Sequence, residues 1–218
     1  MTLWLGLCVT LGAMASNEYH FISDWQVEGT VKEVSDIITE TSSLPQWWPS
    51  VYLNVTVLNP GLEDGTGKVV KLLTRGWLPY ALDWTLRVTE SRHPHGFTLE
   101  AEGDFNGRGV WRFVQDGPQV FIRYDWRIRA DKPLLRTLSF AFKPVFKANH
   151  RWAMDRGEKS LTLELARRRA HSAGPLAVIP PPPAPARFSA LLLWLFCATV
   201  VLAAGACAIA VFRSPATR

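Results

Sequence analysis

Three side chains in this chain, Tyr80, Tyr124 and His150, have the chemistry to move protons to or from a bound molecule. Tyrosine hydroxyls and imidazoles act as general acids or bases when their surroundings tune the pKa. Tyr124 and His150 lie in segments whose pattern predicts an inward-facing side, and Tyr80 precedes such a segment. Buried tyrosines and histidines are more often structural, with their polar atoms hydrogen-bonded. Both a catalytic and a structural role therefore stay open.

Other kinds of reactive or metal-binding site have little support. The three cysteines, Cys8, Cys197 and Cys207, all lie in apolar terminal stretches. The middle of the chain therefore has no thiolate nucleophile, disulfide or cysteine metal ligand. Gly107 and Gly109 resemble part of a nucleotide-binding loop, but they lie in a predicted hairpin and do not open a helix. We predict no metal ion and no cofactor.

Hydrophobic periodicity predicts the elements that must position these side chains. A strand at 19–28 is followed by a helix that opens with the capping box Thr30-x-x-Glu33, and then by a very short helix from Ser43 to Pro49. Further strands separated by turn residues are predicted at 51–59, 67–75, 82–90, 96–104, 108–115 and 119–129. This makes seven strands, with two helices after the first.

Turn chemistry predicts the registers of the last three strands. A two-residue turn at 116–117 places Phe113 opposite Val120, and a three-residue loop at 105–107 places Ala101 opposite Trp111. The second register also pairs Glu100 with Arg112 and Asp104 with Arg108 on the outer face. The inner face then carries no charge; its members are Trp84, Leu86, Val88, Phe97, Leu99, Ala101, Trp111, Phe113, Val120, Ile122, Tyr124, Trp126 and Ile128.

A long helix is predicted from Pro144 to Arg169, because apolar and small residues recur there every three or four positions. Pro144 suits the first helical turn, where its missing N–H is not needed. At Ala153 and Gly157, in the middle of the inward face, little or no side chain projects from the helix. The helix therefore either approaches the sheet closely at this point or leaves space for a ligand.

The order of one strand, two helices, six strands and a long helix resembles the helix-grip fold of the SRPBCC superfamily, specifically its START-like polyketide cyclase/dehydrase and lipid-transport branch. Four motifs carry the resemblance over about residues 19–169. They are the WWP of 47–49 followed by Val51-Tyr52, the GxGxW of 107–111, the YDW of 124–126 and NHRWAMDRGEKSL of 149–161. The resemblance implies an α+β fold in which a curved, seven-stranded antiparallel sheet grips the long C-terminal helix around a deep apolar cavity.

The same resemblance implies a function, because many members of the superfamily bind or carry lipids and other hydrophobic ligands. Others are aromatases or cyclases, and the superfamily has no universal catalytic motif. We therefore expect binding or transport of a hydrophobic small molecule or lipid, with a cyclase/dehydratase-like enzyme and a non-catalytic interaction scaffold as alternatives. The predicted ligand-binding residues are Trp47, Trp48, Trp84, Leu99, Trp111, Phe113, Ile122, Tyr124, Trp126, Asn149, His150, Ala153 and Gly157.

The two ends of the chain differ in composition from the predicted domain at 16–170. Residues 1–15 are apolar without a preceding basic residue, which indicates a mis-set start or a weak signal peptide. Six prolines in residues 171–187 predict an extended linker. Residues 188–212 are uncharged and long enough to span a bilayer, and 213–218 form a short tail.

The formal net charge of +5 is concentrated in arginines that flank this apolar segment. Such a distribution is typical of the edge of a membrane span and not of a nucleic-acid-binding face. We therefore predict a single-pass membrane protein with a C-terminal anchor, its domain on the cytoplasmic side, and no nucleic-acid partner. The arginines are Arg167, Arg168, Arg169, Arg187, Arg213 and Arg218.

Overall fold

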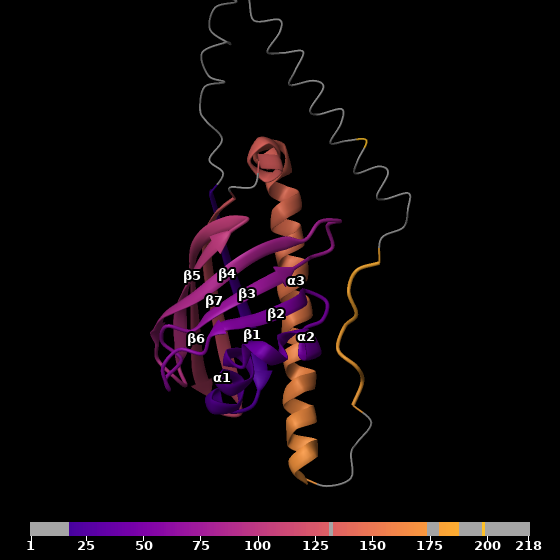
Figure 1. The fold of residues 1–218 in the computed structure, drawn as a ribbon. Helices are drawn as coiled ribbons and strands as arrows, with labels where there is room; N and C mark the ends of the chain where they lie inside the picture. Colours follow the sequence, from indigo (N-terminus) through magenta and orange to yellow (C-terminus); the bar gives the residue numbers. More distant parts are fainter. Residues whose placement is uncertain (1–17, 131–132, 174–178, 188–197, 199–218) are drawn as a thin grey trace, which may run out of the picture. The chain divides into compact units, whose positions relative to one another are not determined.

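The structure, a computed structural model, describes residues 18–130, 133–173, 179–187 and 198 (Figure 1). The chain divides into two compact units, residues 1–185 and 186–218. The predicted N-terminal extension, the short tail and, apart from residue 198, the predicted span at 188–212 lie outside the described residues. Within the described part, no helix is long and apolar enough to cross a membrane.

The described elements follow the predicted order. The strands form one antiparallel sheet in the order β1-β7-β6-β5-β4-β3-β2, and Figure 1 shows the long helix α3 running beside this curved sheet. A seven-stranded sheet with a long helix after it confirms the expected helix-grip architecture. The bounds are β1 (Glu18–Glu28), α1 (Val31–Thr39), the 3-10 turn η2 (Thr41–Ser43), α2 (Leu44–Trp47), β2 (Tyr52–Asn59), β3 (Val69–Thr74), β4 (Leu82–Ser91), β5 (Gly96–Gly103), β6 (Phe105–Asp116), β7 (Gln119–Ala130) and α3 (Pro133–Ala173).

The start of α1 is the predicted capping box. The Glu33 N–H donates to Thr30 Oγ1 at 3.2 Å, and the Thr30 N–H donates to Glu33 Oε2 at 2.8 Å. Arg169 of α3 donates to both oxygens of the same carboxylate, at 2.7 and 2.9 Å. These hydrogen bonds from Arg169 hold the pKa of Glu33 at about 2. One glutamate therefore both starts α1 and ties it to the last turns of α3.

The predicted start of the long helix is wrong by eleven residues, since α3 begins at Pro133 and contains Pro144. Pro133 occupies the first helical position that the sequence pattern assigned to Pro144. An internal proline removes one backbone N–H from the helix ladder, and the helix on either side of it can persist. At its other end α3 continues to Ala173, four residues beyond the predicted Arg169.

The predicted register of the β6–β7 hairpin is wrong by two residues. Phe113 pairs with Ile122 and Asp116 pairs with Gln119, so the turn is made by Gly117 and Pro118. Gly117 has a φ of 54°, which favours glycine, and the Pro118 ring keeps φ negative at the next position. Because the difference is an even number, the same side chains still face inward.

The β5–β6 register differs from the prediction by four residues, since Ala101 pairs with Gly107 in place of Trp111. Gly103 pairs instead with Trp84 of β4, and the Asp104 N–H donates to the Asp83 carbonyl at 3.1 Å. The end of β5 therefore stays with β4. The predicted pairs on the outer face of the sheet are therefore also wrong, since Glu100 lies opposite Arg108 and Arg112 lies opposite Gly96.

At Gly157, α3 packs closely on Trp48, the residue that follows α2. A Cβ atom at this position would overlap the six-membered ring of Trp48, which is 4% exposed. Of the two interpretations that the sequence allowed for Gly157, the structure shows close packing and not ligand space.

Replacing Gly157 with Ala is expected to lower the melting temperature. Overpacking costs about 1–3 kcal/mol, which outweighs the roughly 1 kcal/mol that alanine adds in helix propensity. The control is the same substitution in a Trp48→Phe background, where the smaller ring leaves room and the penalty should shrink. An equal penalty in both backgrounds would mean that the indole does not set this spacing.

Candidate functional site

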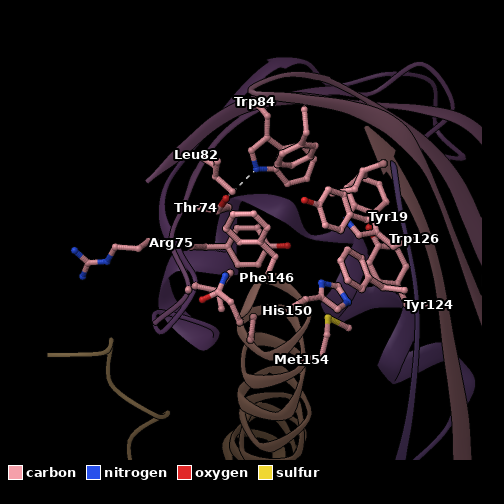
Figure 2. A pocket seen from close by; sticks show the side chains of 18 of the residues that line it. Tyr19, Thr74, Arg75, Leu82, Trp84, Tyr124, Trp126, Phe146, His150 and Met154 are labelled. Atoms are coloured by element: carbon pink, nitrogen blue, oxygen red, sulfur yellow. Dashed lines mark hydrogen bonds between the residues drawn. The ribbon is translucent and has the colours of Figure 1, made fainter. Parts of the chain in front are cut away.

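A cavity of about 190 Å³ lies between the inner face of the sheet and α3, and Figure 2 shows side chains from both converging on it. Most of its lining is aromatic or aliphatic. The lining residues are Tyr19, Phe21, Trp48, Val51, Tyr52, Thr74, Arg75, Gly76, Tyr80, Leu82, Trp84, Phe105, Trp111, Tyr124, Trp126, Ile128, Phe146, Asn149, His150, Ala153 and Met154.

The structure brings many of the predicted site residues to this cavity. The catalytic candidate Tyr80 lines it, as do eight of the predicted ligand-binding residues: Trp48, Trp84, Trp111, Tyr124, Trp126, Asn149, His150 and Ala153. Whether they contact a ligand remains a prediction, but their side chains are in one place.

The other five predicted residues do not line the cavity. Trp47, Leu99, Phe113 and Ile122 are at most 4% exposed and belong to the hydrophobic core. Gly157 is covered by the Trp48 indole. An inward direction along a strand or helix therefore predicts burial, but it does not tell which inward residues border the space that packing leaves empty.

Several lining residues were missed, and part of the signal was present in the sequence. Tyr19 and Phe21 alternate with the exposed His20 and Ile22 on β1, which is the period expected of a strand with one buried face. Phe105 was assigned to a loop and is instead the first residue of β6. Arg75 and Gly76 come from the β3–β4 connection, where no periodicity indicates which residues face inward.

Stacked rings form one wall of the cavity. The Tyr124 ring lies 4.1 Å from that of Trp111 and 5.5 Å from that of Trp126, with interplanar angles of 15° and 22°. A Cβ atom on Gly109 would lie 2.9 Å from the Tyr124 ring and 2.9 Å from the Trp126 ring. The second glycine of the GxGxW motif therefore gives these rings the space to lie across β6.

His150 of α3 is a neutral, partly buried base. Its ring stacks on Phe21 at 4.2 Å, and its Nε2 lies 3.3 Å from Ser23 Oγ. Burial lowers the pKa of His150 from 6.5 to about 4, because the imidazolium would lose its hydration. His150 therefore carries no charge at neutral pH.

Three of the tyrosines that line the cavity are also neutral. Burial raises the pKa of Tyr52, Tyr80 and Tyr124, and for Tyr124 the neighbouring Tyr52 raises it further. Among the lining residues, the permanently charged one is Arg75, and Figure 2 shows its guanidinium directed away from the cavity. The space itself is therefore surrounded by uncharged groups.

Two hydrogen bonds hold the β3–β4 connection at the cavity. The Leu78 N–H donates to Asn149 Oδ1 at 3.2 Å, and Trp84 Nε1 donates to Thr74 Oγ1 at 2.9 Å. Asn149 thus positions backbone from across the cavity. In the described part of the chain, histidine, cysteine and carboxylate side chains form no cluster of three or more that could hold a metal ion.

No protein-family model and no curated protein sequence matches this chain. Solved structures do match its shape. A START superfamily protein from Mycobacterium smegmatis superposes with a TM-score of 0.56 and 15% identity, covering 68% of this chain and 98% of that one. The Zhui aromatase/cyclase from a Streptomyces species gives 0.55 and 16%, covering 72% and 99%. A Thermus thermophilus protein gives 0.57 and 12%, covering 69% and 99%.

These likenesses establish the fold. The domain has the same helix-grip fold as the START superfamily protein and the aromatase/cyclase. At such low identities the likeness carries no activity, because function depends on the particular site and not on the fold.

The neutral state of His150 can be tested by titration. We expect its imidazole signals in NMR to change with a midpoint near pH 4. Because the unfolded chain binds this proton already near pH 6.5, the free energy of unfolding should fall as the pH drops from 6.5 towards 4. His150→Gln should weaken this part of the pH dependence. A midpoint near 6.5 would show that His150 is solvated.

Proposed function

We propose that this protein binds a hydrophobic small molecule in the cavity between its sheet and α3. The observation that carries the proposal is the lining, which is mostly aromatic and directs no charged group into an open space of about 190 Å³. Sites of this kind, mostly apolar with a few convergent polar groups, are the usual places where proteins hold small ligands. The helix-grip neighbours include a START superfamily protein, which is in line with this proposal.

A cyclase/dehydratase-like enzyme is the second candidate, because Tyr80, Tyr124 and His150 do meet at the cavity. The solved neighbours include an aromatase/cyclase. However, the protonation states of Tyr80, Tyr124 and His150 argue against proton transfer at neutral pH. An efficient general acid or base has a pKa near the working pH, whereas burial moves both tyrosines up and His150 down to about 4. Binding without catalysis is therefore the better-supported function.

A pure scaffold is the third candidate, and the open cavity argues against it. A domain that served only to dock partners through its outer face would have no need of an interior space. Here the aromatic side chains border the space and do not fill it.

Filling the cavity is expected to abolish ligand binding. We predict that full-length protein from a lipid-containing host retains a co-purifying hydrophobic compound, detected by native mass spectrometry and solvent extraction. Ala153→Phe should lose this compound, because the new ring would occupy the space that Ala153 borders. The matched control is Ala148→Phe at an exposed position on the same helix.

Ala148→Phe should keep the compound, and both variants should unfold at similar temperatures. Retention of the compound by a folded Ala153→Phe protein would place the binding site elsewhere. Consistently empty wild-type protein that also binds no added apolar compound would refute the proposed function.

We further propose that residues 188–212 anchor the protein in a membrane with the domain on the cytoplasmic side. The support is twenty-five uncharged residues flanked by arginines. Apolar ligands partition into bilayers, so an anchor would keep the cavity near their source. The full chain should resist alkaline extraction from membranes, whereas a chain ending at Arg187 should not. A protease added outside intact cells should leave the domain uncut; cleavage would reverse the proposed orientation.

A further inference from the structure

We infer that the ligand is a neutral molecule built on one aromatic ring. This inference rests on the proposed binding function and names the ligand class. It follows from the volume of the cavity, the charge of its lining and the aromatic rings that border it.

The volume limits the ligand to the size of a substituted benzene. An engineered protein cavity of about 150 Å³ takes up benzene, with its six carbon atoms, so by proportion about 190 Å³ holds roughly eight non-hydrogen atoms. A ring with one or two small substituents fits this limit. A sterol or a long-chain fatty acid is several times larger and would leave most of its apolar surface in water.

The lining excludes a charged ligand. An ion that enters an apolar site loses its hydration, and this loss is offset only by an opposite charge or by several hydrogen bonds. His150 and three of the cavity tyrosines are neutral, and the Arg75 guanidinium points away from the space. No carboxylate side chain lines the cavity in the described part of the chain. Neither a carboxylate nor an ammonium ligand therefore meets a counter-charge.

The aromatic walls favour an aromatic guest over an aliphatic one of equal size. Aromatic rings attract one another in offset-stacked and edge-to-face arrangements, in addition to the apolar area that they bury. The stack of Trp111, Tyr124 and Trp126 and the tilted pair of Trp84 and Phe105 both border the space. A planar ring can extend such an arrangement.

The experiment compares probes of matched shape and different charge. Full-length protein in lipid nanodiscs, with empty nanodiscs as the blank, is titrated with toluene, benzyl alcohol, benzylammonium and benzoate, and then with oleate and cholesterol. Toluene and benzyl alcohol should bind, and Ala153→Phe should prevent both. Each ion should bind at least about tenfold more weakly than benzyl alcohol, a difference of about 1.4 kcal/mol.

The outcomes separate this inference from the proposed function. Binding of oleate or cholesterol at this site, with none of the single-ring probes, would overturn the ligand class while the binding function stands. Equal or tighter binding of either ion would overturn its neutrality. Failure of every probe, together with empty protein from the host, would refute the binding function itself.

Discussion

The contact between Trp48 and Gly157 is the constraint on which the site depends. α3 can lie close to the α2 end of the domain because position 157 has no side chain, and the indole of Trp48 fills the space. The same indole packs edge-on against Trp25 and lines the cavity. Farther along α3, the bond from Arg169 to Glu33 ties the helix to α1. With its C-terminal half held at these points, α3 presents Ala153, His150 and Phe146 to the space beyond.

The opposite wall follows from the same rule that a small residue lets large rings approach. Gly109 allows Tyr124 and Trp126 to lie across β6, where they continue the stack that begins at Trp111. Rings held in this way cannot easily collapse inward, because each is packed on its neighbours. The cavity thus depends on two glycines, Gly157 on the helix and Gly109 on the sheet, and on the aromatic rings for which they leave room.

Burial then decides the chemistry of the space. His150 and three of the cavity tyrosines have polar atoms, and desolvation moves their pKa values further from neutrality, so that they carry no charge at neutral pH. Interactions with a ligand are therefore limited to ring contacts and single hydrogen bonds. This favours holding an uncharged molecule over activating one, and it explains how a fold shared with an aromatase/cyclase can present a site suited to binding.

The sequence by itself determined the element order, the capping box at Thr30 and the uncharged inner face, because periodicity and local hydrogen bonds depend on neighbouring residues. It placed Trp84, Tyr124 and Trp126 on the side where the cavity lies. Only the tertiary structure decided the registers, which depend on how Gly117-Pro118 turns and where β5 leaves β6. Only the tertiary structure also showed that Trp48 and His150 line the cavity, whereas Trp47 lies in the core and Gly157 is covered by the Trp48 indole. In the sequence, the inward faces of the helix and of the strands look uniformly apolar. The empty space arises only where side chains from distant segments fail to meet.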